Sequence, residues 1–210
     1  MGMQTPFSDL FRRLSRLDVA LLVLSIGLIA WAQVRLSGTE AGLLHEELRL
    51  GPTPVTITRA ADAPAGPVVV IAHGFAGSRQ LMLPYAQTLA RAGYTAVRFD
   101  FAGHGRSGSA LTGSITDPDG ATRTLVDETK KVVAHARGLG DGRLAILGHS
   151  MASDIIIRTA IEAPDIAATV AISMFSPAVT ESEPRNLLVI VGDLETQLKD
   201  EALRVVGLVA

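Results

Sequence analysis

Ser150 is the residue whose neighbours best suit covalent chemistry in this chain of 210 residues. It stands at the centre of Gly148-His149-Ser150-Met151-Ala152, between an apolar stretch over 144–147 and a stretch of helical pattern over 151–163. A serine at such a strand-to-helix turn exposes its hydroxyl above the sheet at a helix amino terminus. Small flanking residues avoid clashes with the strand and the helix. The pattern predicts a nucleophilic serine; the alternative is a serine that only caps the helix.

A second candidate loop, His73-Gly74-Phe75-Ala76-Gly77-Ser78, follows the apolar stretch Val68–Ala72. Gly74 and Gly77 would let the backbone approach a substrate closely. His73 is better suited to holding this loop by hydrogen bonds than to acting as a base. We expect His73, Gly74 and His149 to line the site.

These elements, in this order, resemble the α/β-hydrolase superfamily over about residues 48–206. The loop after Val68–Ala72 looks like the oxyanion-hole loop of that superfamily. Asp100 to Ser107 (DFAGHGRS) looks like its D-x-x-G-H-G-x-S loop, and Gly148 to Ala152 looks like its nucleophile elbow, with Ala152 where the family usually has glycine. The combination is most similar to small carboxylic-ester hydrolases. Peptidases and transferases of the superfamily share the same motifs.

The resemblance also implies roles for other groups. The backbone N–H groups of Phe75 and Met151 would hold the oxyanion of an acyl-transfer reaction, which needs donors already aimed at it. The stretch over 187–191 ends in Gly192-Asp193-Leu194-Glu195, where the family has Gly-x-x-Asp. Counting from the glycine indicates Glu195 as the acid that orients the histidine, with Asp193 as the alternative. Both could also be ordinary residues of a strand–helix junction.

The histidine of such a triad is missing from its place after the acid. The histidines of this chain, which all precede Ser150, are His45, His73, His104, His135 and His149. The sequence therefore predicts a hydrolase domain without its last strand and histidine loop, a fragment or truncated gene product with feeble activity at best. Two alternatives stay open: a base supplied by one of the histidines near the site (His73, His104 or His149), and a non-catalytic module that binds a ligand or partner.

The elements that must position these residues alternate between strands and helices. Strands are predicted around 47–50, 55–59, 68–72, 94–99, 144–147, 168–173 and 187–191, and helices over 78–91, 125–137, 151–163 and 196–206. Continuous apolar stretches such as Val68–Ala72 are typical of strands covered on both faces. The alternation predicts an α/β fold with a mostly parallel sheet and helices on both faces. Asp127, Glu128 and Asp154 are expected to be solvated helix residues.

Residues 1–36 are expected to form a membrane anchor or signal segment ahead of a hydrolase domain over 37–210. The 16 residues from Val19 to Val34 carry no formal charge. A helix of that length spans about 24 Å, and Arg16 and Arg35 at its ends can extend it toward the two interfaces of a core roughly 30 Å thick.

The positive charges before this span predict its orientation. Arg12, Arg13 and Arg16 would keep the amino terminus cytoplasmic and place the catalytic domain on the outer side. A cleaved signal peptide, with Ala30-Trp31-Ala32 as its cleavage site, is the alternative and would give a secreted domain. A buried amphipathic helix is a third possibility.

Composition narrows the function classes further. Nineteen Lys and Arg against 21 Asp and Glu give a net charge of −2, without the basic excess of a nucleic-acid-binding protein. Zero cysteines exclude a disulfide framework, a cysteine-based zinc site and a thiol nucleophile. We therefore expect a small-molecule ester or acyl substrate, with no metal, no cofactor and no nucleic acid.

Overall fold

The computed structural model describes residues 15–209 except 116, 118, 177, 180–183 and 185. The chain divides into two compact units, Met1–Ala41 and Gly42–Ala210. This division lies close to the predicted limit between residues 36 and 37, and the assignment of the two parts as membrane segment and hydrolase domain stays a prediction. Arg12 and Arg13, on which the predicted orientation depends, lie outside the described residues.

Helix α2 (Arg16–Gly38) belongs to the first unit. Ser15 and Asp18 close its amino end as a capping box: the Ser15 hydroxyl accepts from the Asp18 N–H at 3.2 Å, and the Asp18 carboxylate accepts from the Ser15 N–H at 2.8 Å. None of its residues is buried, and it is long and apolar enough to cross a membrane. A helix that is apolar all round has no polar face to turn to water, which suits lipid. A signal sequence near the amino terminus has the same features.

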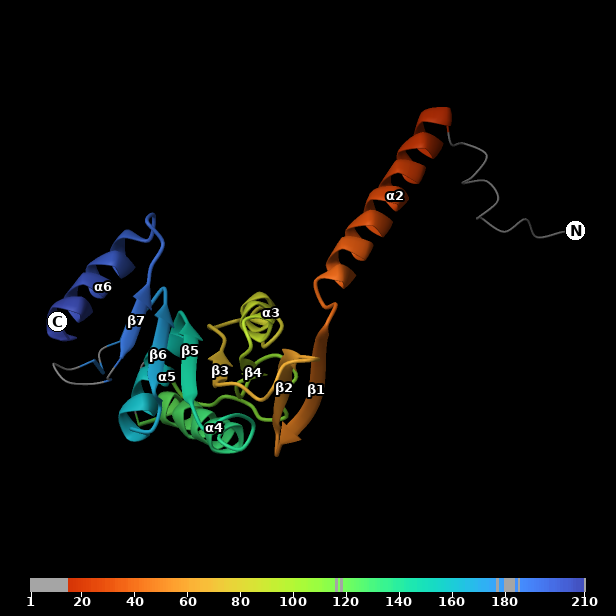
Figure 1. The fold of residues 1–210 in the computed structure, drawn as a ribbon. Coiled ribbons are helices and arrows are strands. Elements are labelled where there is room, and N and C mark those ends of the chain that lie inside the picture. The colour runs from red at the N-terminus through yellow and green to blue at the C-terminus, as the bar shows by residue number, and fades with distance from the viewer. Residues whose placement is uncertain are drawn as a thin grey trace, which may run out of the picture. The chain divides into compact units, whose positions relative to one another are not determined.

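The second unit is built on a seven-stranded sheet (Figure 1). Its strands are β1 (Leu43–Leu50), β2 (Thr53–Ala60), β3 (Val68–Ala72), β4 (Thr95–Phe99), β5 (Leu144–His149), β6 (Ala168–Ile172) and β7 (Leu187–Ile190). Their order is β1-β2-β4-β3-β5-β6-β7. The pairs β1–β2 and β2–β4 are antiparallel, and all other pairs are parallel. The predicted α/β fold with a mostly parallel sheet is confirmed.

Helices cover both faces of this sheet. Successive side chains of a strand point to opposite sides, so the apolar residues of one strand need partners on both faces. Val70 packs in one cluster with side chains of α4 (Ala121–Ala136) and α5 (Met151–Glu162). Its neighbours Val69 and Ile71 pack on the other face with side chains of α3 (Leu83–Arg91). Figure 1 shows α3 on the opposite side of the sheet from α4. Helix α6 (Thr196–Val209) packs on the α5 side, where Val205 meets Ile157.

Three element boundaries differ from the sequence predictions by four residues or more. Helix α3 begins at Leu83 instead of Ser78, because residues 78–82 form turns and Pro84, with its fixed φ, lies in the first helical turn. Helix α4 begins four residues earlier than predicted, directly after Gly120. Strand β1 begins at Leu43 instead of Glu47, because it pairs with β2 along its whole length, from Leu43 opposite Ala60 to Leu50 opposite Thr53.

Candidate active site

The carboxyl ends of the parallel strands bring the candidate residues to one edge of the sheet. His73 follows β3, Asp100 follows β4, Ser150 follows β5, Ser173 follows β6 and Glu195 lies five residues after β7. Ala72 is in register with Gly148, and Gly148 with Ala171, so the ends of β3, β5 and β6 lie level with one another. Residues far apart in the sequence therefore meet around Ser150, at the edge where α/β sheets ordinarily bind ligands.

Ser150 occupies the sharp turn between β5 and α5. Its φ of 54° and ψ of −120° form a backbone conformation that a residue with a side chain rarely adopts. The Ser150 N–H donates to the Ile172 carbonyl of β6 at 2.9 Å, which holds the turn. A Cβ atom on Gly148 would lie only 2.6 Å from the Ala152 carbonyl oxygen, so glycine is required where the strand meets the helix. Ser150 is exposed and lines a cavity of about 340 Å³.

The loop after β3 packs directly against this turn. A Cβ atom on Gly74 would lie 3.1 Å from Ser150 Cβ and 3.1 Å from His149 Nδ1. The N–H of Phe75, the next residue, has no acceptor within the described ranges. The N–H of Met151 is also unpaired there, because the first N–H groups of a helix have no partner inside the helix. Two unoccupied backbone donors thus lie next to Ser150 and Gly74 in the sequence.

His73 and His104 brace the loops that surround the turn. His73 is buried, its Nδ1 bonds the Gly74 carbonyl at 2.8 Å, and its Nε2 accepts the Phe101 N–H at 3.1 Å. Burial lowers the pKa of His73, which favours the neutral ring that these two bonds require. His104 Nδ1 bonds the Ala102 carbonyl at 2.9 Å, and its ring packs edge-on against Phe75. Neither ring is hydrogen-bonded to Ser150.

His149 directly precedes Ser150 at the end of β5. Across the described part of the chain, its side chain forms no hydrogen bond. His45 bonds the Thr58 hydroxyl at 3.0 Å on β1 and β2, and His135 belongs to α4. No imidazole in the described ranges therefore bridges Ser150 and a carboxylate.

The two candidate acids have different surroundings. Glu195 Oε2 accepts the Gly192 N–H at 2.7 Å and the Ser173 hydroxyl at 2.9 Å, and these hydrogen bonds hold the pKa of Glu195 below its ordinary value. Ser173 lines the same cavity as Ser150. Asp193 is 88% exposed and pairs with Lys199 at 2.7 Å. The geometry thus connects Glu195, and not Asp193, with the cavity.

A buried ion pair that the sequence did not indicate joins two of these loops. Asp100 accepts the backbone N–H of Arg79 at 2.7 Å and that of Arg106 at 2.9 Å, and it pairs with the Arg79 guanidinium. Arg79 follows the loop of His73, whereas Asp100 begins the loop after β4. The pair therefore fixes one loop against the other. Arginine is rarely buried, so residue type alone gave no signal for Arg79.

The prediction that Glu128 and Asp154 are solvated is wrong. Glu128 is buried and accepts the Ala102 N–H at 2.8 Å and the Thr53 hydroxyl, because this side of α4 faces the sheet. Asp154 lines the cavity at Ser150 and accepts bonds from Arg158 and Ser176. Asp127 is exposed, as predicted, and pairs with Arg123.

The cavity at Ser150 has a mostly apolar wall. Its lining comprises the apolar Ile115, Met151, Ile155, Phe175 and Leu198 and the polar Thr122, Ser150, Asp154, Arg158 and Ser173. A hollow of about 550 Å³ shares Ile115 with it and extends past Phe75 and His104. The edge of the sheet thus offers space on both sides of the turn at Ser150.

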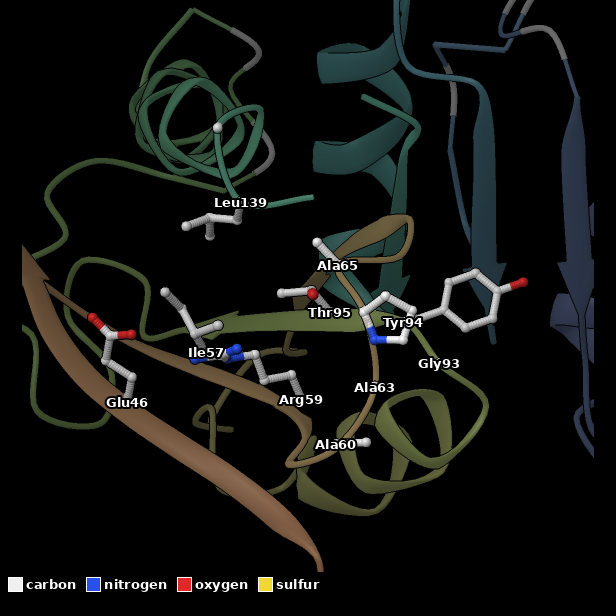
Figure 2. Close-up of a pocket in the computed structure, with 12 residues that line it drawn as sticks. Glu46, Ile57, Arg59, Ala60, Ala63, Ala65, Gly93, Tyr94, Thr95 and Leu139 are labelled. Carbon is white, nitrogen blue, oxygen red and sulfur yellow. The ribbon is translucent and has the colours of Figure 1, made fainter. Parts of the chain in front are cut away.

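A further pocket of about 210 Å³, drawn in Figure 2, lies at the opposite edge of the sheet. Glu46 and Arg59, from β1 and β2, line it together with Leu139 and Thr95, the first residue of β4. Its position separates it from Ser150, so we assign it no part in the reaction. Among the described residues, no group of three or more His, Cys, Asp or Glu side chains is arranged to hold a metal ion.

Comparisons with known proteins match one family and two curated relatives. Residues 63–203 match the family described as "Serine aminopeptidase, S33". The quorum-quenching protein AidA of Acinetobacter baumannii is 26% identical over 68% of this chain and 47% of its own length. The dihydrolipoyllysine-residue acetyltransferase component of the acetoin cleaving system of Cupriavidus necator is 32% identical over 50% of this chain and 25% of its own length. The chain therefore spans about half, or less, of these relatives.

Solved structures share the fold. The esterase Pf2001 of Pyrococcus furiosus is 22% identical, with a TM-score of 0.51 over 62% of this chain and 52% of that chain. An epoxide hydrolase of Vigna radiata is 20% identical, with a TM-score of 0.50 over 65% of this chain and 40% of that chain. At these identities the likeness concerns the architecture alone.

Proposed function

Because the chain belongs to the serine aminopeptidase S33 family of the α/β-hydrolase superfamily, we propose that it is a serine hydrolase that cleaves carboxylic esters or related acyl bonds. One observation carries this proposal: Ser150 is held in a strained turn, open to a cavity, beside the unoccupied N–H groups of Phe75 and Met151. Strain of this kind concentrates at functional sites. A serine that only capped α5 would bond its hydroxyl to the helix, and Ser150 makes no side-chain cap bond.

In the proposed reaction, Ser150 Oγ attacks the carbonyl carbon of the substrate and displaces its alcohol. The negative charge that develops on the carbonyl oxygen would be stabilised by the N–H groups of Phe75 and Met151, which are fixed before the reaction begins. Water would then hydrolyse the acyl-enzyme. Both steps need a base that takes a proton from the attacking oxygen and returns it to the leaving group.

Glu195 is proposed to orient that base. Its Oε2 is occupied by Gly192 and Ser173, which leaves Oε1 for an imidazole N–H. The rings of His73 and His104 are committed to the loops. His149 is hydrogen-bonded to neither Ser150 nor Glu195 within the described residues, although its charge contributes to the lowered pKa of Glu195. We therefore expect Ser150 in this chain to react slowly, at the level that oxyanion stabilisation and binding alone can provide.

Labelling with a fluorophosphonate probe tests this proposal on the full chain in detergent. We expect slow labelling that is absent in Ser150→Ala and unchanged in the control Ser109→Ala. Added imidazole should raise the Ser150-dependent turnover of p-nitrophenyl acetate, measured as the difference from Ser150→Ala. If Ser150 is not labelled with or without imidazole, the nucleophile is disproved and a non-catalytic binding module is favoured. Loss of labelling in His149→Asn would identify His149 as the base.

A peptidase using the same residues is the second candidate, since the matched family is described as an aminopeptidase. An amine is a poorer leaving group than an alcohol and depends more strongly on protonation by the base. We therefore expect p-nitrophenyl esters to react faster than the corresponding p-nitroanilides, and the reverse order would favour the peptidase. Transfer of the acyl group to an acceptor other than water would use the same residues and would appear as partitioning of product when such an acceptor is added.

We also propose that α2 anchors the chain in a membrane, with the hydrolase domain on the outer side. The absence of buried residues along α2 and its apolar character support an anchor. The proposed orientation depends on Arg12, Arg13 and Arg16, which precede the span. Release of a chain that begins after Ala32 would instead support a cleaved signal peptide and a secreted domain.

A further inference from the structure

Arg158 places a guanidinium in the wall of the cavity at Ser150. Met151, Asp154, Ile155 and Arg158 stand at positions i, i+3, i+4 and i+7 of α5, and all four line the cavity. Arg158 Nε donates to Asp154 Oδ2 at 2.8 Å, and Ser176 Oγ donates to Asp154 Oδ1 at 2.7 Å. Both oxygens of this carboxylate are thus engaged. The terminal nitrogens of Arg158 have no acceptor in the described part of the chain.

Arg123 on α4 forms a similar pair with a carboxylate four residues away, and it also binds a second carboxylate. It binds Asp127, four residues away, through Nε at 3.1 Å and Nη2 at 2.6 Å. Its Nη1 also holds the Glu162 carboxylate at 2.5 Å, so one guanidinium serves two carboxylates. Within the described residues, Arg158 binds only the carboxylate four residues away, and its terminal nitrogens donate to no second carboxylate there. Arg158 lines the cavity at Ser150 instead.

The terminal nitrogens of Arg158 are within reach of an acyl group attached to Ser150. Asp154 lies four residues beyond Ser150, which corresponds to about 6 Å along the helix axis. Long helical side chains lean toward the amino terminus, and the bond to Asp154 keeps the Arg158 head group at that level. Ile115, Ile155 and Phe175 supply apolar wall to the same cavity. An acyl chain would therefore cross apolar surface before it meets a cation.

We infer that the site selects acyl groups that carry a carboxylate at their far end, and that Arg158 determines this selectivity. The inference rests on the proposed function insofar as Ser150 receives the acyl group. A guanidinium with free terminal N–H groups matches the geometry of a carboxylate, and such charge-assisted pairs are stronger than neutral hydrogen bonds. An extended chain advances roughly 1.3 Å per carbon, so half-esters of short dicarboxylic acids such as glutarate fit the distance.

Binding to the full-length Ser150→Ala variant tests the inference without acylation. The probes are monomethyl glutarate and methyl pentanoate, which have similar length but differ in the terminal carboxylate, and their affinities are measured by calorimetric titration. We expect monomethyl glutarate to bind about tenfold more tightly or better, as one charged hydrogen bond provides. Adding Arg158→Met should abolish this preference. A second variant, Arg158→Met with Asp154→Asn, avoids leaving an unpaired carboxylate and should give the same result.

Arg137→Met is the matched control, because Arg137 pairs with Asp165 on the surface and does not line the cavity. It should keep the preference. Equal affinity for the two esters before any arginine is changed, or a preference that survives in both Arg158 variants, would overturn the inference. Fluorophosphonate labelling tests the proposed function separately. Labelling without a carboxylate preference disproves the inference alone, whereas an Arg158-dependent preference without labelling supports the inference and disproves the hydrolase.

Discussion

Replacing Asp100 by alanine should lower the free energy of unfolding by about 3–5 kcal/mol, the cost of breaking a buried ion pair from one side. The Arg79 and Asp100 side chains are only 4% and 1% exposed, so water cannot replace the lost carboxylate. The substitution also removes the acceptor of the Arg79 and Arg106 backbone N–H groups. Since domains are stable by about 5–15 kcal/mol in total, a loss of this size consumes much of the stability.

A double-variant cycle separates the ion pair from its surroundings. Unfolding in urea, followed by circular dichroism on the full chain in detergent, gives the free energies for Asp100→Ala, Arg79→Met and the two combined. The double variant removes both charges, so we expect its loss to be smaller than the sum of the single losses by about 2 kcal/mol. Arg79 also approaches Glu47 at 3.7 Å, but Glu47 is 62% exposed. The control Glu47→Gln should therefore cost about 1 kcal/mol or less.

Two results would refute this reasoning. One is an Asp100→Ala loss below about 1 kcal/mol, the value of an exposed pair. The other is strict additivity of the two single losses. Either would show that Asp100 and Arg79 do not depend on each other, and that the loops after β3 and β4 are held by other contacts.

Three further predictions concern the elbow, the surface charges and the membrane segment. Gly148→Ala should lose fluorophosphonate labelling and destabilise the fold by about 1–3 kcal/mol. The reason is that the new Cβ would lie 2.6 Å from the Ala152 carbonyl oxygen and displace α5. Normal labelling of this variant would contradict the tight turn. Hydrogen bonds from Arg123 and Lys130 lower the pKa of Glu162 from 4.5 to about 2, so the contribution of this carboxylate to stability is present above about pH 4.5 and is lost toward pH 2. Wild type should exceed Glu162→Gln by about 1 kcal/mol or less at pH 6 and lose this lead at pH 2, and a difference independent of pH would disprove the linkage. Leu28→Arg should reduce the fraction of chain retained in carbonate-washed membranes, since an arginine near the centre of a span costs about 2.5–3.5 kcal/mol; unchanged retention would argue against a spanning α2.

The sequence by itself determined the fold class, the strand–helix order and the position of the strand-to-helix turn at Ser150. These features depend on local patterns: the apolar stretch Val68–Ala72, the strand before Ser150 and the helix after it each reveal their type through neighbours a few residues away. Gly148 could be interpreted without a structure for the same reason, since the clash that excludes a larger residue comes from Ala152, four positions on.

Only the tertiary structure decided which polar side chains face the site. Asp193 and Glu195 lie two residues apart and look alike in sequence. Glu195 nevertheless meets Ser173, which follows β6, whereas Asp193 meets Lys199 and solvent. Glu128 was expected in solvent because its sequence neighbours do not reveal that Thr53 and Ala102 lie beside it in the fold. The positions of such groups depend on partners that lie 22 to 75 residues away along the chain. A charged side chain is stable in the interior only where the fold supplies such a partner, and the fold brings these partners together through packing that no local pattern records.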